Sequence, residues 1–471
     1  MLDQTKPLWQ ARACDVAAAV GAGELSCTDA VGAAVDRMRA VNGELNAVVD
    51  DLGEQALADA AAADKALADG AAPGPLQGVP VTIKVNIDQT GRATTNGVTA
   101  FKDVIAPGDA PVVSNLKKAG AIVIGRTNTP EFSFRATTSN EVHGRTKSPW
   151  NDWVTSGGSS GGASSAVISG MGAIGHGNDI GGSLRFPAWA TGAATVKPGL
   201  GRVPAYNPSA PAERGLLAQL MSVQGAICRN VADVRLAMQS LIQPDPRDPW
   251  QAPVPWEGAP LPKKVAFSKN MFEFDLSPHV SAALDTAASA LSDAGYEVVE
   301  AEPPELREVA WEAKKCLFGE TLGLMGGDIE KYGSDTIKAI FGEYAKMFTP
   351  YEGKDLQLGM ARRSAHVRKW MLFLAEYPLI LTPFMPTLPF KWDRDTEGAE
   401  GVEEVLGAAI WSSAMNFLGL PAGNVSAGFA EGLPIGVQIV GQRFREDFIL
   451  DACEVVEAHV GVMAERLWAN G

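Results

Sequence analysis

The order of apolar and polar residues predicts a succession of helices and strands along the first half of the chain. In the segment 79–87 apolar and polar residues alternate one by one, which predicts a strand with one apolar and one polar face. Upstream, the alanine-rich stretch 29–70 is amphipathic at helical spacing and predicts two helices. The same reasoning predicts a helix over 112–118, a strand over 121–125 and a short helix over 163–169.

The second half of the chain repeats this organisation. Short apolar runs at 265–267 and 296–299 flank a helix that begins near Ser277, and a strand, helix, strand unit of this kind implies parallel strands. Two further strands, over 380–382 and 435–440, are expected to return to the same sheet. The pattern therefore predicts an α/β fold in which helices cover both faces of one large mixed sheet, an α/β/α sandwich.

A proline-rich segment separates the two halves. Seven prolines fall within 243–262, which indicates a connection rather than a regular element. A chain of 471 residues is long enough for about three domains, but a large α/β sheet often forms one. We expect a single domain over 1–471, with N-terminal helices at 8–70, a motif-bearing core at 71–242, the connection at 243–262, and a second half at 263–471 that contains an aromatic-rich insertion at 305–392.

Composition and charge exclude several classes of function. With 46% hydrophobic and 20% charged residues, the chain has the composition of an ordinary soluble globular protein. Its 55 acidic and 40 basic residues give a net charge of −15, which disfavours binding to nucleic acid or to anionic membranes. No apolar run approaches the roughly 20 residues of a spanning helix, and the first residues are polar where a signal peptide is hydrophobic. We therefore expect a cytoplasmic protein, a monomer or a homodimer.

Two glycine-serine blocks and one lysine carry the candidate chemistry. Ser159 lies in Gly-Gly-Ser-Ser-Gly-Gly at 157–162, and Ser183 lies in Gly-Gly-Ser-Leu-Arg-Phe-Pro at 181–187. A serine hydroxyl is a weak nucleophile until a base removes its proton, and a lysine can be that base when burial keeps its amine neutral. Lys84, in the predicted strand, is the candidate base. Because a hydroxyl both donates and accepts, Ser159 could pass a proton from Ser183 to Lys84, which points to acyl transfer.

The glycines beside Ser183 suggest how a developing oxyanion is stabilised. Residues without Cβ let backbone N–H groups turn inward, so the amides of Ile180, Gly181, Gly182 and Ser183 are expected to form a nest around the oxyanion. The helix predicted after the first block would direct the positive end of its dipole at the same place.

Six sequence blocks together resemble the amidase signature family of serine hydrolases. The resemblance runs from about residue 8 to about residue 465. The blocks lie at 74–84, 125–132, the two glycine-serine segments, 196–199 and 432–438. The resemblance implies the same α/β/α fold and a triad in which Ser183 is the nucleophile, Ser159 is a cis-serine that follows a cis peptide bond at Gly158, and Lys84 is the base.

One position departs from the common family pattern. Where the family usually has Gly-Thr-Asp before the nucleophile loop, this chain has Gly-Asn-Asp at 177–179, preceded by His176. The variant is similar to the branch that hydrolyses nylon-type cyclic amides, which argues against assuming a primary-amide substrate. His176 could line the site or pack behind the loop.

Taken singly, each of these motifs has another interpretation. Gly-Gly-Ser-Ser-Gly-Gly alone is typical of a flexible linker, and the polar face around Lys84 is typical of a solvated strand. Two overlapping Gly-x-Ser-x-Gly patterns within 157–162 match a nucleophile elbow, but the preceding residues 149–153 predict a loop instead of a buried strand. Ser-x-x-Lys at 114–117 has no Lys-Thr-Gly partner and is interpreted as a helix surface.

The substrate region is expected in the aromatic-rich span. Of 34 aromatic residues, 13 fall within 311–392, more than twice the even share, and core packing of a helical insertion explains the excess as readily as a binding wall. In the family the corresponding region is the variable wall of the acyl pocket. The candidate substrate-binding residues are therefore Trp311, Phe318, Phe341, Tyr344, Phe348 and Trp370.

These observations predict an amidohydrolase that needs no cofactor and no metal. The five cysteines and five histidines show no ligand spacing that would indicate a metal site. We expect cleavage of a small-molecule amide or related C–N bond through an acyl-serine intermediate, with secondary amides, anilides or carbamates with hydrophobic substituents favoured. The alternatives are a glutaminase subunit of a transamidation complex and a catalytically silent amidase-like scaffold that binds a ligand or a partner.

Overall fold

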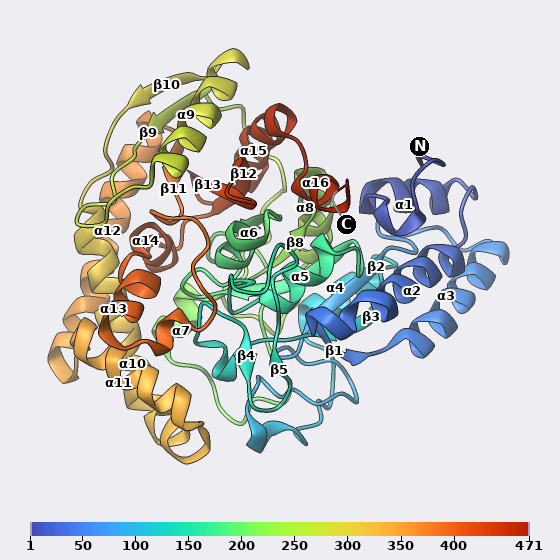
Figure 1. The fold of residues 1–471 in the computed structure, drawn as a ribbon, viewed down its shortest axis with the longest axis horizontal. Helices are drawn as coiled ribbons and strands as arrows, with labels where there is room; N and C mark the ends of the chain where they lie inside the picture. Colours follow the sequence, from blue (N-terminus) through green and yellow to red (C-terminus); the bar gives the residue numbers. More distant parts are fainter. Residues whose placement is uncertain (1, 470–471) are drawn as a thin grey trace.

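The computed structural model describes residues 2–469, and its centre is one mixed sheet of 11 strands (Figure 1). The strand order across the sheet is β1-β3-β2-β6-β8-β7-β12-β13-β11-β9-β10. The strands are β1 Val48–Asp51, β2 Pro80–Lys84, β3 Ile122–Thr127, β6 Ile174–Asp179, β7 Ala194–Lys197, β8 Val223–Cys228, β9 Lys264–Phe267, β10 Glu297–Glu300, β11 Leu379–Pro383, β12 Ala422–Ala430 and β13 Leu433–Gly441.

Parallel pairs lie toward both ends of this sheet, its middle is antiparallel, and the edge strand β1 pairs antiparallel with β3. β2 runs parallel to β3 and β6, and β9 runs parallel to β10 and β11, whereas the strands from β6 across to β11 pair antiparallel. The predicted strand, helix, strand unit is confirmed as β9, α9 (Pro278–Asp293) and β10. The two strands predicted to return to the sheet, β11 and β13, lie beside each other.

Helices cover both faces of the sheet, and the alternation of side chains along β11 shows this directly. Leu379 and Leu381 pack in the same cluster as α9, whereas Ile380 between them packs with α10 (Leu306–Tyr332) on the opposite side. The helices on the α9 side are α4 Pro111–Lys118, α8 Val231–Leu241 and α15 Glu446–Val460, and those on the opposite side include α5 Gly161–Ile168 and α6 Arg185–Thr191. The predicted α/β/α sandwich is thereby confirmed.

Long helices of the second half gather beside this sandwich (Figure 1, yellow to orange). α10 contacts α11 (Asp335–Phe348), α12 (Gly353–Glu376) and α14 (Ile410–Leu418). Helices α10, α11 and α12 belong to the predicted insertion at 305–392, which is therefore mainly helical. The remaining helices are α1 Ala13–Gly21, α2 Cys27–Leu45, α3 Gly53–Ala68, α7 Leu216–Met221, α13 Gly398–Val402 and α16 Met463–Ala469, and a two-stranded sheet pairs β4 Ser139–Asn140 with β5 Gly144–Arg145.

The predicted elements are present, with a few differences in extent. α2 and α3 are the two helices expected over 29–70, but the short strand β1 between them was not predicted, because its four residues acquire strand geometry only by pairing with β3. The strand predicted over 79–87 ends earlier, at Lys84, where the chain leaves the sheet. The segment 243–262 contains no helix or strand, as its prolines predict. The division into one domain stays a prediction.

Two glycines of β6 let helix α5 and the nucleophile loop approach the sheet closely. A Cβ at Gly175 would lie 3.1 Å from Ala163 of α5, and one at Gly177 would lie 2.8 Å from both Leu184 and the Ser160 hydroxyl. A larger residue at either position would push the first serine block away from the strand. The same strand therefore controls the spacing of the candidate site.

Among residues 2–469, no helix combines the length and the apolar composition needed to cross a membrane.

Candidate active site

Lys84 lies at the end of β2 with its side chain fully buried. Its Nζ lies 2.7 Å from Ser159 Oγ, 3.1 Å from Ser160 Oγ and 2.8 Å from Asn178 Oδ1. Lys84 contacts Ser159 and Ser160, which directly precede α5, so the face of β2 that carries Thr82 and Lys84 lies toward α5. The polar face of the predicted strand is therefore a buried wall of the site, because α5 covers it.

Burial sets the protonation of Lys84. Loss of water around the amine lowers its pKa well below the ordinary value, and the negative charge of Asp179 offsets this only in part. No carboxylate contacts Nζ within residues 2–469, and its three neighbours are neutral oxygens. The site thus favours the neutral amine, the form that can accept a proton.

The first serine block turns into helix α5 at this point. The Gly158–Ser159 peptide bond is cis, as the family resemblance implies. A Cβ at Gly158 would lie 2.4 Å from the Arg135 carbonyl oxygen, so this position admits only glycine at the observed backbone spacing. Ser160 then precedes the first residue of α5, so the block is the beginning of a buried helix and not a flexible linker.

The loop that carries Ser183 is held by a buried ion pair. Asp179 accepts hydrogen bonds from the Gly182 N–H at 2.8 Å and the Leu184 N–H at 3.1 Å, and it pairs with Arg185 Nε at 3.1 Å. Burial alone would raise the pKa of Asp179, but the charge and hydrogen bonds of Arg185 outweigh it and lower the pKa to about 2. Arg185 also donates to Gln438 Oε1 at 2.9 Å, which ties the loop to β13.

The predicted oxyanion nest is modified by this ion pair. The Gly182 N–H is engaged by Asp179, so it is not free to bind an oxyanion. The amides of Ile180, Gly181 and Ser183 donate to no other group within residues 2–469. Three of the four predicted amides therefore remain available to bind an oxyanion, because the Asp179 carboxylate already accepts the hydrogen bond of the fourth, that of Gly182.

Ser183 and Ser159 belong to segments joined by the backbone. The Ser160 N–H donates to the Ser183 carbonyl oxygen at 3.2 Å, whereas no direct hydrogen bond links the Ser159 and Ser183 hydroxyls among the described residues. Lys84 therefore contacts Ser159, the next residue Ser160 binds the backbone of Ser183, and Ser183 opens on a cavity.

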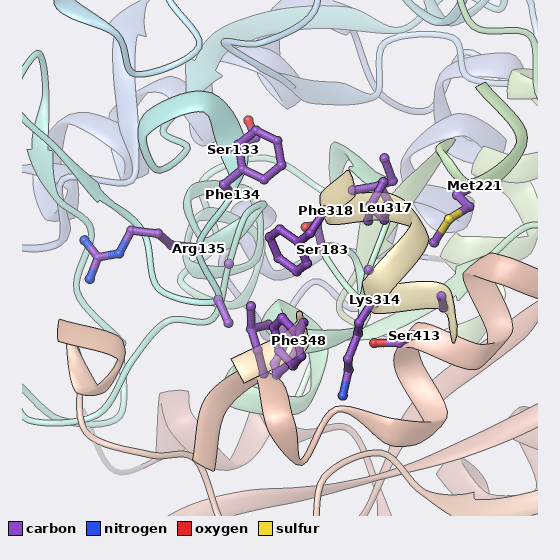
Figure 2. Close-up of a pocket in the computed structure, with 17 residues that line it drawn as sticks. Ser133, Phe134, Arg135, Ser183, Met221, Lys314, Leu317, Phe318, Phe348 and Ser413 are labelled. Carbon is purple, nitrogen blue, oxygen red and sulfur yellow. The ribbon is translucent and has the colours of Figure 1, made fainter. Parts of the chain in front are cut away.

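The cavity beside Ser183 is mostly apolar (Figure 2). Its volume is about 660 Å³, which includes the part that is open to solvent. Its floor is formed by Gly158, Ile180, Gly181 and Ser183. Its walls are Ser133, Phe134, Arg135, Ala136, Phe186, Met221, Ala313, Lys314, Leu317, Phe318, Phe348, Leu406 and Ser413. No aspartate or glutamate is among these described lining residues.

Both cations on the wall are already engaged. Arg135 points its guanidinium away from Ser183 (Figure 2), and it binds Asp393 and Asp395, the latter at 2.7 Å. Lys314 donates to the Gly407 carbonyl oxygen at 2.8 Å and lies over the rings of Trp311 and Phe348. Burial lowers the pKa of Lys314 to about 7, so its charge is weakened near neutral pH. The cavity therefore favours an apolar ligand.

A family model described as Amidase matches residues 29–450. The chain belongs to the amidase family. The matched residues include both glycine-serine blocks and Lys84. The fold class and the reaction class inferred from the sequence are confirmed, and the protein is an amidohydrolase.

Individual relatives agree with this assignment. The amidase is 50% identical over 467 residues to an indoleacetamide hydrolase of Bradyrhizobium diazoefficiens, covering 98% of this chain and 89% of the relative. It is 31% identical over 476 residues to an acylamidase of Rhodococcus erythropolis, covering 97% and 96% of the two chains. Among solved structures, 6-aminohexanoate cyclic dimer hydrolase bound to its substrate aligns with a TM-score of 0.82 at 26% identity, covering 97% and 98%. The similarity to cyclic-amide hydrolases expected from the sequence is thus confirmed.

Two of the six aromatic candidates line the amidase cavity. Phe318 of α10 and Phe348 of α11 face it, and their rings stack 5.2 Å apart. Phe341 and Tyr344 pack in the same apolar cluster but are not among the lining residues, and the ring of Trp311 lies 5.7 Å from that of Phe348. Trp370 lies in another cluster, beside Trp411, because its helix α12 faces α14 instead of the cavity.

Several residues that shape the site were not identified from the sequence. Asn86 and Ser160 join the hydrogen-bond network around Lys84 and Asn178, and Met221 and Leu406 reach the cavity from distant elements. The position of Ser160 next to Ser159 was a usable signal, whereas single apolar residues such as Met221 carry none. His176 is buried with Nε2 at 3.0 Å from Gln224 Oε1 and is not among the described cavity lining residues. Its burial lowers the pKa to about 3, so the ring is neutral.

Carboxylates cap two helices of the cavity wall. Glu131 accepts a hydrogen bond from the Ser334 N–H at 2.8 Å at the start of α11. Glu320 of α10 accepts from the N–H groups of Leu217 and Ala218, both at 2.8 Å, in the first turn of α7. Because α7 ends at Met221 on the cavity wall, the Glu320 cap fixes the position of that wall.

Removing the cap of α7 is expected to destabilise the protein and weaken substrate binding together. Glu320→Ala leaves two backbone donors unpaired, which should lower the free energy of unfolding by about 2 kcal/mol. Urea denaturation measures this change, and KM should rise because Met221 moves. Glu330→Ala, on the exposed part of the same helix, is the matched control and should change stability by less than about 0.5 kcal/mol. Equal stabilities of the two variants would contradict a capping role.

Proposed function

We propose that this amidohydrolase cleaves amides whose acyl part is a flat aromatic group on a short linker, as in an arylacetamide. The observation that supports this most is the opening of Ser183 onto a cavity with mostly apolar walls and no acidic residue among the described lining residues. The 50% identical relative is named for hydrolysis of indoleacetamide, whose aromatic ring is of this kind. Burying about 200 Å² of aromatic surface would contribute about 5 kcal/mol of binding free energy before the costs of ordering.

The proposed reaction uses Lys84, Ser159 and Ser183 in sequence. Neutral Lys84 accepts the proton of Ser159, Ser159 accepts the proton of Ser183, and Ser183 Oγ forms a bond to the amide carbon. The oxygen of the former carbonyl carries the negative charge and is bound by free backbone amides of the loop. When the C–N bond breaks, the proton on Lys84 returns through Ser159 to the leaving nitrogen, which departs as ammonia or an amine.

Hydrolysis of the acyl-serine completes the cycle. A water molecule gives a proton to the Ser159–Lys84 pair, and its oxygen attacks the ester carbon of acylated Ser183. The ester bond breaks, the proton returns to Ser183 Oγ, and the carboxylic acid is released. One amide and one water yield one acid and one amine. The Lys84 amine and the hydroxyls of Ser159 and Ser183 carry every proton that is transferred.

The substrate class is tested by comparing three amides under identical conditions. Phenylacetamide, phenylacetanilide and L-glutamine separate an apolar acyl group from a charged one, and a primary from a secondary amide. We expect kcat/KM for phenylacetamide to exceed that for glutamine by about 100-fold, which corresponds to about 2.7 kcal/mol. The anilide tests the preference for secondary amides predicted from the sequence. A higher kcat/KM for glutamine would refute the proposal and favour a role in transamidation.

The cavity wall itself is tested by a pair of substitutions on α11. Phe348→Leu removes aromatic surface that lines the cavity and should raise KM for phenylacetamide about fivefold, with kcat little changed. Phe341→Leu is the matched control, since Phe341 lies on the same helix but outside the described cavity lining. If both substitutions change KM equally, the acyl group does not bind against Phe348.

A further inference from the structure

The orientation of the Lys84 lone pair can be deduced from the three oxygens around Nζ. A neutral amine has two N–H donors and one lone pair, whereas Nζ has three neighbours, Ser159 Oγ, Ser160 Oγ and Asn178 Oδ1. Two neighbours must therefore accept an N–H, and the third must donate its own proton to the lone pair. Only the donor to the lone pair can pass a proton to Lys84.

Asn178 must be an acceptor, because its amide is held by a second asparagine. Asn178 Nδ2 donates to Asn86 Oδ1 at 3.1 Å, and Asn86 Nδ2 donates back to Asn178 Oδ1 at 3.3 Å. Asn86 Nδ2 also donates to Ser133 Oγ at 3.0 Å, and Ser133 commits its single hydroxyl proton to Asn96 Oδ1 at 2.6 Å. The chain of donors fixes both amides, so Asn178 presents its oxygen to Lys84.

Ser160 is also an acceptor toward Lys84. Its hydroxyl donates to the Asn178 backbone oxygen at 3.4 Å and accepts from the Asn178 N–H at 3.4 Å. The one proton of the hydroxyl is thus used by the backbone of β6, and its remaining lone pair faces Nζ at 3.1 Å. Asn178 and Ser160 together take both N–H groups of the neutral amine.

We propose that Asn178, assisted by Ser160, is a positioning residue that turns the lone pair of Lys84 toward the hydroxyl of Ser159. This inference rests on the proposed function, in which Lys84 is the base. It explains how the site distinguishes two adjacent serines that both lie within hydrogen-bond distance of one amine. It also assigns a role to the side-chain amide of Asn178. The amide oxygen faces Lys84 and carries no proton, so it accepts a hydrogen bond from the amine and leaves the lone pair for Ser159.

Few other charges act on Lys84. Asp179 is the acidic group that raises its pKa, and the charge of Asp179 is matched by Arg185. His176, on the same strand as Asn178, is neutral because its pKa is lowered to about 3. A change of charge at position 178 should therefore be felt mainly by Lys84.

The test follows the rate at which a fluorophosphonate phosphonylates Ser183 as a function of pH. This reagent can be used without knowing the natural substrate. Its reaction rate falls at low pH because less Lys84 is in the neutral form, and this fall is the acid limb of the profile. Asn178→Asp places a carboxylate against Nζ and should move the limb up by about one pH unit or more. Asn178→Leu removes an acceptor of the ammonium form and should move the limb down. Both should slow the plateau rate on the order of tenfold or more, since the lone pair loses its direction.

Controls separate a positioning role from a structural one. Asn424→Leu makes the same change at another buried asparagine of the sheet, whose amide has no partner among residues 2–469, and should leave the profile unchanged. The inference would be overturned if the acid limbs of both variants stay at the wild-type pH or move in the same direction. Labelling of Ser183 in the wild type would still support the proposed function in that case. Wild-type protein that is not labelled on Ser183 would overturn both. If Asn178→Leu does not fold, the pH of the acid limb in the near-isosteric Asn178→Asp tests the inference by itself.

Discussion

Ser183→Ala is expected to abolish turnover, with a loss of kcat on the order of 10³-fold or more. The physical reason is that no other hydroxyl among residues 2–469 combines access to the cavity with a place next to the free amides of the loop. Ser159→Ala should also be severely impaired, because the hydroxyl that remains at Lys84 Nζ, that of Ser160, donates its proton to the Asn178 backbone oxygen. Steady-state kinetics on phenylacetamide measures both losses.

The site of covalent modification decides between the serines. Mass spectrometry of the fluorophosphonate adduct should place it on the peptide that contains Ser183. Ser292→Ala, on an exposed position of α9, is a control for handling and should retain full turnover and labelling. An adduct on Ser159 or Ser160 would contradict the assignment and favour a nucleophile elbow at 157–162.

Lys84→Arg is expected to be as inactive as Lys84→Ala, although it keeps a basic side chain. A guanidinium does not release its proton in the accessible pH range, so it cannot serve as the base. In the wild type, burial lowers the pKa of Lys84, and the neutral amine forms as pH rises through that lowered value. The rate kcat/KM should therefore rise along an acid limb, and Lys84→Ala should eliminate that limb together with most activity.

The same lowered pKa predicts a sign for stability against pH. Between the pKa of buried Lys84 and its ordinary value of 10.5, the unfolded chain binds a proton that the folded chain does not. The contribution of Lys84 to the free energy of unfolding should therefore rise with pH across that window, and Lys84→Met should remove this part of the slope. Near-normal turnover in Lys84→Arg would mean that Lys84 is a structural cation and that the base lies elsewhere.

The sequence by itself predicted the features that depend on neighbouring residues. Alternation over 79–87 and helical spacing over 29–70 are local properties, and each is present in the structure as β2 or as α2 and α3. The glycine-serine blocks carry their own backbone requirements, since a Cβ at Gly158 would lie 2.4 Å from the Arg135 carbonyl oxygen. Residue type and spacing were enough to single out Lys84, Ser159 and Ser183; the structure brings Lys84 and Ser159 into contact and places Ser183 on the cavity, and the catalytic roles of the three stay a prediction.

Only the tertiary structure decided which side of each element is buried and what it meets. Alternation cannot distinguish a polar strand face in solvent from one covered by a helix. In the structure α5 covers the polar face of β2, and Lys84 is therefore buried. Aromatic composition likewise could not separate Phe318 and Phe348, which line the cavity, from Trp370, which packs on Trp411. A cavity wall joins side chains from segments far apart in the chain, so its membership depends on helix packing that no local pattern records.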